Sequence, residues 1–131
     1  MRFLVLMLPN LPTDNADDWM PSADQVAEMS KFNQELSNAG VLLALDGLHP
    51  ASEAVHVSFS NGKPKVIDGP FAEAKEVVGG YWILQCKSKE EAVEWARRCP
   101  VFNDATIEIR QIMELEEFPP DVQAAAGERL V

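Results

Sequence analysis

The chain has 131 residues, 47% of them apolar, which is enough for one globular domain with its own hydrophobic core. Its formal net charge of −10 disfavours nucleic acid and anionic membranes as partners, because like charges repel. No apolar run approaches the ~20 residues that span a bilayer. Two cysteines, Cys86 and Cys99, are too few for a disulfide framework, which predicts reduced thiols in a cytoplasmic protein.

The first expected element is a strand at residues 3–8, an apolar run without alternation that Pro9 ends. The competing interpretation, a signal peptide, is disfavoured because no small-residue cleavage site follows the run. Residues 10–21 are polar, acidic and bounded by prolines, which is typical of a loop. Within this loop, Trp19 and Met20 are expected to pack down onto the domain.

The first helix is expected at residues 22–39. Ser22 and Gln25 have the spacing of a capping box, and Gly40 stands where the C-terminus of a helix favours a left-handed residue. Apolar residues three or four apart predict the buried face of this helix and indicate no cofactor role. These residues are Val26, Met29, Phe32, Leu36 and Ala39.

The middle of the chain is expected to hold a buried strand and a hairpin. Residues 41–45 are apolar without alternation, as in a strand that is covered on both faces. A hairpin is expected at residues 55–68, because two strand-like segments flank Asn61 and Gly62, the strongest short hairpin signal. Pro64 confines the returning strand to a sheet edge.

The stretch at residues 68–82 breaks the pattern around it. A Gly-Pro pair at residues 69 and 70 forces a tight change of direction. Gly79 and Gly80 allow the backbone to pass close to another segment, because neither residue has a Cβ atom. A strand at residues 81–86, apolar on both faces, follows directly.

The last part of the chain is expected to hold a helix, a strand and a tail. Ser88 and Glu91 have capping-box spacing and open a helix that Pro100 ends. Its buried side is expected to hold Ala92, Val93, Trp95, Ala96 and Cys99. Residues 105–113 alternate apolar and polar side chains, as a strand does. Residues 114–131 form an acidic tail.

The expected order is β-α-β, a hairpin and a second β-α-β. Both helices lie on one face of the sheet, because such crossovers are right-handed. This order predicts an α+β fold, a ferredoxin-like sandwich with an antiparallel sheet and an inserted hairpin. The other face has no helix on it, yet the strands at residues 3–8 and 81–86 are apolar on both faces. Because soluble monomers rarely expose such a patch, the sequence predicts a homodimer that joins these faces.

A series of short motifs runs along the chain: Phe32-Asn33-Gln34-Glu35-Leu36, Ala39-Gly40-Val41, Asp46-Gly47-Leu48-His49-Pro50, Asp68-Gly69-Pro70-Phe71-Ala72-Glu73-Ala74-Lys75-Glu76, Gly79-Gly80-Tyr81-Trp82, Glu94-Trp95-Ala96, Cys99-Pro100 and Glu108-Ile109-Arg110. Together they resemble the YCII-related family, in its DGPF subgroup, over about residues 1–113. The family pattern usually has Thr where Ala74 stands and Glu where Asp46 stands.

The resemblance implies a dimeric α-β barrel, with a YCII-related (DGPF) domain at residues 1–113 and the acidic C-terminal tail at residues 114–131. Relatives of the YCII type carry a His–Asp pair proposed to be catalytic, with the histidine on the first helix. The expected helix at residues 22–39 contains no histidine. DGPF members resemble proteins of unknown role that are often encoded near extracytoplasmic-function sigma factors, which implies a regulatory or accessory role.

No catalytic residue is assigned, but three residues are candidates for acid–base work. His49 is a candidate because a histidine is suited to proton transfer near neutral pH, and Asp46 or Asp68 would orient its imidazole. The structural alternative is a surface turn that holds Asp46 and His49, with Asp68 accepting backbone hydrogen bonds at the Gly-Pro turn.

The candidates for ligand binding are Phe71, Glu73, Lys75 and Tyr81. If the loop folds over the mouth of the barrel, Glu73 and Lys75 are the pair best placed to meet a ligand. Tyr81 would contribute a hydroxyl group to the same pocket. The structural alternative is a solvated charged run followed by a buried strand tyrosine.

No metal and no cofactor are expected. His49, His56, Cys86 and Cys99 lack the CxxC or HxxxH spacing of metal ligands. The Gly-Gly pair lacks the sequence context of a phosphate-binding loop.

Three hypotheses of function remain open. The leading one is a cytoplasmic homodimer that binds a small molecule near the DGPF turn, as a binding or accessory protein. The second is a cofactor-independent acid–base enzyme that acts on a small substrate with a His–Asp pair. The third, a protein–protein module linked to a sigma factor, rests on the resemblance alone.

Overall fold

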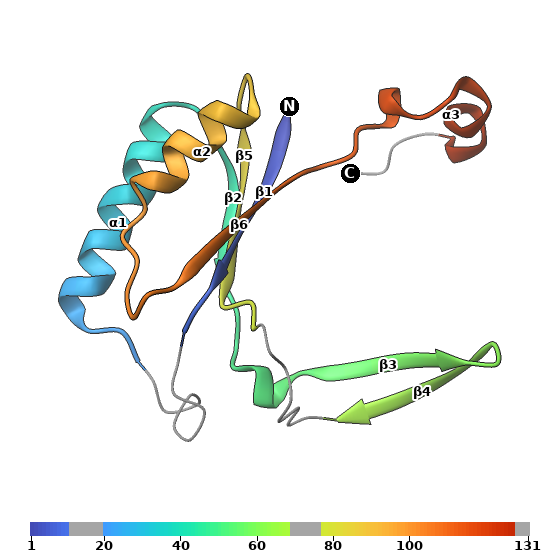
Figure 1. The fold of residues 1–131 in the computed structure, drawn as a ribbon, viewed down its shortest axis with the longest axis horizontal. Coiled ribbons are helices and arrows are strands. Elements are labelled where there is room, and N and C mark those ends of the chain that lie inside the picture. The colour runs from blue at the N-terminus through green and yellow to red at the C-terminus, as the bar shows by residue number, and fades with distance from the viewer. Residues whose placement is uncertain (11–19, 69–76, 128–131) are drawn as a thin grey trace.

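A four-stranded antiparallel sheet with the strand order β2-β5-β1-β6 forms the centre of the fold (Figure 1). The computed structural model describes residues 1–10, 20–68 and 77–127. The sheet strands are β1 (Arg2–Leu8), β2 (Leu42–Gly47), β5 (Gly80–Gln85) and β6 (Thr106–Gln111). The other elements are helices α1 (Ala23–Asn38), α2 (Lys89–Arg97) and α3 (Pro120–Ala126), strands β3 (Val55–Ser60) and β4 (Lys63–Asp68), and 3-10 turns at Ala51–Glu53 and Leu115–Glu117.

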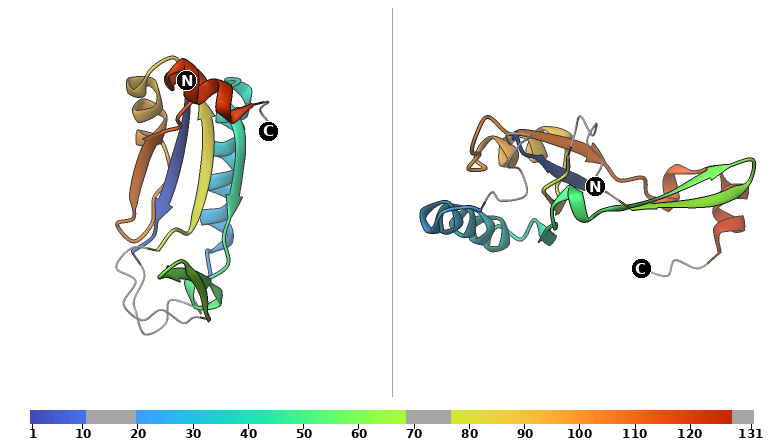
Figure 2. Two further views of the ribbon diagram at one scale, coloured as in Figure 1. Left: turned by 90° about the vertical axis from the view of Figure 1, so that its right-hand side faces the viewer. Right: turned by 90° about the horizontal axis from the view of Figure 1, so that it is seen from below.

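Helices α1 and α2 cover one face of the sheet and leave the other face open (Figure 1, Figure 2). Strands β3 and β4 form a separate two-stranded sheet. This hairpin projects from one end of the open side, and α3 lies beyond the other end. The predicted α+β, ferredoxin-like arrangement with an inserted hairpin is confirmed. Among the described residues, none of the helices has the length and apolar character that a membrane crossing requires.

The hydrophobic core lies between the sheet and its two helices. Phe3 and Leu84 project from the central strands into this layer and are almost fully buried. Phe32 and Leu36 meet them from α1. The ring of Phe32 stands edge-on to the Trp82 indole, with 6.1 Å between the ring centroids, a favourable geometry for an aromatic pair.

The alternate residues of the central strands point away from the helices and form an open face. Leu4 pairs with Ile83, and Leu6 pairs with Tyr81, across β1 and β5. These four side chains are only half-buried in the single chain. The residues of the open face include Leu4, Leu6, Leu8, Ala44, Asp46, Tyr81, Ile83, Thr106, Glu108 and Arg110.

A serine caps the N-terminus of both sheet-covering helices. The Ser22 hydroxyl accepts a hydrogen bond from the backbone N–H of Gln25 at 3.2 Å, and the side-chain Oε1 of Gln25 accepts one from the backbone N–H of Ser22 at 2.9 Å. The predicted capping box of α1 is thus confirmed. The second predicted capping box is wrong in one of its two bonds. Ser88 accepts from the Glu91 amide at 3.1 Å, but the Glu91 carboxylate accepts from the Lys87 amide at 2.8 Å.

Gly79 and Gly80 make the close backbone approaches that the sequence predicts. A Cβ atom on Gly79 would lie 3.1 Å from Cγ of Pro9, and one on Gly80 would lie 3.0 Å from the carbonyl oxygen of Asp46. Gly80 also pairs with Gly47 across β5 and β2. A methyl group at residue 80 would therefore push on backbone that the sheet holds in place.

Replacing Gly80 with alanine is expected to lower the free energy of unfolding by about 1–3 kcal/mol, the typical cost of overpacking. Urea denaturation followed by circular dichroism measures this change. Gly47→Ala is the matched control, because a Cβ atom there meets nothing within 4 Å. Equal urea midpoints for the two variants would contradict the close approach at residue 80.

Candidate functional site

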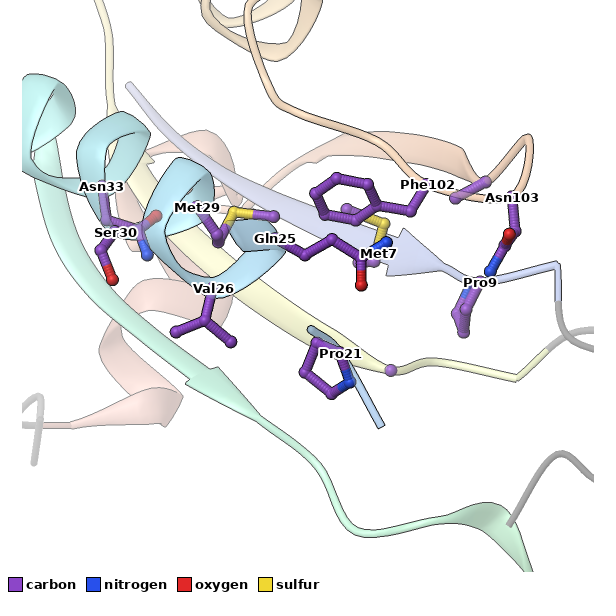
Figure 3. A pocket seen from close by; sticks show the side chains of 12 residues that line it. Met7, Pro9, Pro21, Gln25, Val26, Met29, Ser30, Asn33, Phe102 and Asn103 are labelled. Atoms are coloured by element: carbon purple, nitrogen blue, oxygen red, sulfur yellow. The ribbon is translucent and has the colours of Figure 1, made fainter. Parts of the chain in front are cut away.

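A pocket of about 370 Å³ lies beside the N-terminal half of α1, on the helix-covered side of the sheet (Figure 3). Its volume falls within the range of about 300–1,000 Å³ that is usual for small-molecule sites. The end of β1 forms one wall through Met7 and Pro9. Helix α1 contributes Gln25, Val26, Met29, Ser30 and Asn33, and the loop before β6 contributes Phe102 and Asn103.

The apolar stripe of α1 divides between the core and this pocket. Phe32 and Leu36 are buried in the core, whereas Met29 lines the pocket and Val26, also in its wall, remains 49% exposed. The prediction of one continuous buried face is therefore wrong for Val26, and also for Ala39, which is exposed. The end of β1 and the β6 loop reach this part of α1 only through the tertiary fold, and helix periodicity carries no information about them.

A left-handed turn presents Phe102 and Asn103 to the pocket. Asn103 and Asp104 have φ angles of 56° and 55°, a region that few residues with side chains adopt, although Asn and Asp tolerate it best. The Ala105 amide closes the turn by donating to the Phe102 carbonyl oxygen at 3.3 Å. Two successive left-handed residues are typical of a type I′ turn. The turn thus fixes the wall of the pocket that lies opposite α1.

The described pocket wall is apolar, with a few neutral polar groups. Met7, Met29 and Phe102 supply large apolar surfaces. The polar side chains are the amides of Gln25, Asn33 and Asn103 and the hydroxyl of Ser30. No acidic, basic, histidine, cysteine or tyrosine side chain belongs to this wall in the described part of the chain. Such a wall is suited to holding a neutral molecule and offers no group for proton transfer at neutral pH.

Two predicted candidates meet on the open face of the sheet. The Tyr81 hydroxyl donates a hydrogen bond to Oδ2 of Asp46 at 2.8 Å, across β5 and β2. This hydrogen bond, with the charge of the carboxylate, raises the pKa of Tyr81 above its usual value of 10. The phenol therefore stays protonated at neutral pH and acts as a donor. Neither residue lines the pocket beside α1.

Asp46→Asn is expected to lower the pKa of Tyr81 toward 10, because the substitution removes the negative charge beside the phenol. Tyr81 is the only tyrosine in the chain, so absorbance at 295 nm during an alkaline titration reports on it alone. In the wild type, the stabilisation from this bond is present below pH 10 and is lost as the pH rises through the raised pKa. Identical titration curves for wild type and variant would contradict the contact.

The other catalytic candidates lie apart from this pair. His49 Nδ1 is 3.2 Å from Oε2 of Glu53, and the His49 side chain is 89% exposed. Asp68 ends β4 and is also exposed. His49 and Asp68 are not among the residues that line the pocket. Phe71, Glu73 and Lys75, as well as Trp19 and the Gly-Pro turn, lie outside the described residues.

The two cysteines lie on the covered side of the sheet and are not bonded to each other. Burial raises the pKa of Cys99 to about 12 and also raises that of Cys86, so their thiols are protonated at neutral pH. Within residues 1–10, 20–68 and 77–127, no group of three or more His, Cys, Asp or Glu side chains could hold a metal ion.

Comparison with known proteins places the chain in a family. A family model for the YCII-related domain matches residues 1–116. The chain belongs to the YCII-related family. A Rhizobium meliloti (strain 1021) protein named only as uncharacterized is 32% identical to this YCII-related chain over 90 residues, which are 67% of this chain and 73% of that protein.

A solved structure resembles the YCII-related chain more distantly. It is 5-chloro-2-hydroxyhydroquinone dehydrochlorinase (TftG) from Burkholderia phenoliruptrix AC1100, in complex with 2,5-dihydroxybenzoquinone. The likeness covers 88% of this chain and 98% of TftG, with 13% sequence identity and a TM-score of 0.45. At that level the likeness assigns neither an activity nor a ligand to this chain.

Proposed function

We propose that this YCII-related protein binds a neutral small molecule in the pocket beside α1 and works as a homodimer. The observation that carries the proposal is the pocket wall, which joins apolar surfaces to neutral amides and lacks any titratable group among the described residues. A binding or accessory role fits such a wall better than acid–base catalysis does.

The open face supports the homodimer. Leu4, Leu6 and Ile83 stand at its centre, on the two inner strands of the sheet, and none of the helices in the described part of the chain covers them. Soluble monomers seldom leave a contiguous apolar patch on a sheet exposed. We propose a second copy of the chain as the partner, because a two-fold axis brings the open faces of two copies together and each apolar face then covers the other.

The β3–β4 hairpin gives a second reason for a dimer. Every residue from 55 to 68 is exposed. One side of the hairpin is apolar: Val57 pairs with Val66 and Phe59 pairs with Pro64, and Phe59 is 73% exposed. An isolated two-stranded hairpin is at best marginally stable in water. Packing the apolar side against a second copy would bury these residues.

The neutral fluorophore Prodan tests this proposal, together with light scattering. We expect saturable binding of one Prodan per chain with a blue-shifted emission, and a particle of twice the 14.5 kDa chain mass. Absence of saturable binding would overturn the binding function. A monomer in physiological salt would overturn the homodimer.

An acid–base enzyme without a cofactor is the second candidate, favoured by the hydrogen bond between Asp46 and Tyr81. In this alternative the Tyr81 hydroxyl holds the Asp46 carboxylate in place by donating its hydrogen bond to it, and Asp46 acts as the base that takes a proton from the substrate. Turnover of a small substrate that Tyr81→Phe abolishes would support the enzyme, and unchanged turnover in that variant would exclude this site.

Three further features stay predictions: the DGPF subgroup, the cytoplasmic location and the link to a sigma factor. The Asp-Gly-Pro-Phe sequence at residues 68–71 supports the subgroup. Co-purification from the native host tests the sigma factor link. If no sigma factor is found with the purified protein, an accessory role of that kind is disfavoured.

A further inference from the structure

Two amide side chains in the pocket already accept hydrogen bonds from the protein through their oxygen atoms. Gln25 Oε1 accepts from the backbone amide of Ser22 at 2.9 Å, and Asn33 Oδ1 accepts from the indole Nε1–H of Trp82 at 2.8 Å. A backbone amide and an indole can only donate, so the amide atom that faces each of them must be oxygen. These contacts fix the orientation of both side chains, which otherwise is ambiguous for Asn and Gln.

The amide nitrogens of the same two residues remain for a ligand. Among the described residues, neither Nε2 of Gln25 nor Nδ2 of Asn33 has a hydrogen-bond partner. No buried side-chain nitrogen or oxygen in the described part of the chain lacks a partner, so these two unpaired nitrogens are accessible from outside the protein interior. Figure 3 shows the Gln25 side chain reaching from α1 into the pocket. The α1 wall therefore presents N–H donors.

The two donors stand on one face of α1. Gln25, Met29 and Asn33 follow one another at intervals of four residues, and all three line the pocket. Eight residues of helix rise by about 12 Å, so the two amides mark opposite ends of an apolar floor formed by Met29. A ligand with a single acceptor would meet one of them, and an elongated ligand with two acceptors would meet both.

Charge narrows the class of ligand further. An anion would also accept hydrogen bonds from amides, but no Lys, Arg or His is among the described lining residues. The net charge of −10 opposes the approach of an anion as well. The acceptor that suits this pocket is therefore an uncharged oxygen.

We propose that the pocket selects neutral, largely apolar ligands that carry a carbonyl oxygen, and that Gln25 and Asn33 donate hydrogen bonds to it. This proposal rests on the proposed binding function and names the ligand class of that site. Among the described residues no hydrogen bond fixes the orientation of the Asn103 amide, so this side chain can turn to meet a further polar group of the ligand.

Two isosteric substitutions test the role of the donors. Asn33→Asp keeps the oxygen that Trp82 needs, and Gln25→Glu keeps the oxygen of the capping box, but each replaces the pocket-facing NH₂ group with an acceptor. Gln34→Glu is the matched control: it makes the same charge change on the same helix, at an exposed residue that does not line the pocket. Measurements at pH 8 keep the new carboxylates ionised.

The probes are acetophenone and ethylbenzene, which differ in one carbonyl oxygen. Two-dimensional NMR of the ¹⁵N-labelled protein measures the affinity of each probe. Because the ketone loses hydrogen bonds to water when it binds, its affinity alone does not measure the hydrogen bonds from the pocket. The ratio of acetophenone affinity to ethylbenzene affinity is therefore compared between the wild type and each variant. We expect Asn33→Asp or Gln25→Glu to lower the ratio of acetophenone to ethylbenzene affinity by about fivefold or more, the worth of one hydrogen bond. Gln34→Glu should leave the ratio unchanged.

Each outcome separates the ligand class from the binding function. In the wild type, acetophenone should shift the side-chain NH₂ signals of Gln25 or Asn33, whereas ethylbenzene should shift mainly the signals of Met29 and Phe102. If both probes bind and neither isosteric variant changes the ratio, the carbonyl preference is wrong and the binding function stands. If neither probe shifts any signal from the pocket, both proposals fall.

Discussion

Replacing Ile83 with glutamate is expected to convert the proposed dimer into monomers of 14.5 kDa. Ile83 lies in the middle of the open face, between Leu4 of β1 and Ala44 of β2. In a two-fold dimer each copy would bury one unpaired carboxylate, which costs several kcal/mol per charge. Light scattering after size-exclusion chromatography measures the mass.

Ser37→Glu is the control for this substitution, because it places the same charge on an exposed position of α1. It should leave the mass unchanged. Far-UV circular dichroism checks that the Ile83 variant keeps its helices and strands. A well-folded Ile83→Glu protein with the mass of a dimer would mean that the two copies meet elsewhere.

Replacing Val26 with tryptophan is expected to lower the affinity for Prodan at least about tenfold, a loss of roughly 1.4 kcal/mol or more. Val26 stands in the pocket wall with 49% of its surface exposed, so a larger side chain can grow into the pocket without overpacking the core. The indole would occupy the volume that the ligand needs. A fluorescence titration measures the change.

Ala27→Trp is the matched control for the pocket variant. Ala27 is the next residue of α1, is exposed and does not line the pocket. It should bind Prodan with the affinity of the wild type, since the indole there points away from the pocket wall. Equal affinities in the Val26 and Ala27 variants would place the dye outside the pocket.

Much of the fold follows from local sequence signals. The runs at residues 3–8 and 81–86 predict strands that are apolar on both faces, and β1 and β5 are the inner strands of the sheet. The same prediction for residues 41–45 is wrong, because β2 lies at the edge of the sheet and Leu43 is 48% exposed. Asn61 and Gly62 set the hairpin turn, with φ angles of 52° and 76°. The missing Cβ atoms of Gly79 and Gly80 predict close approaches that Pro9 and Asp46 supply.

The candidate site was harder to predict, because its parts come from distant segments. Sequence patterns favour titratable residues in turns, such as His49, but the structure brings His49 to Glu53 rather than to Asp46. The pocket instead combines α1 with the end of β1 and a left-handed turn near residue 103. Neutral amide side chains on a helix do not indicate a binding site in the sequence. Only the structure shows that their oxygens are already hydrogen-bonded and that their N–H groups are left for a ligand.

Intermolecular nuclear Overhauser effects would show directly whether a neutral ligand occupies the pocket beside α1. The measurement uses wild-type protein saturated with acetophenone and records contacts between the ligand and the protein methyl groups. We expect contacts to the methyl groups of Met29 and Val26, which line the pocket. Contacts confined to Leu4, Leu6 and Ile83 of the open face would contradict it.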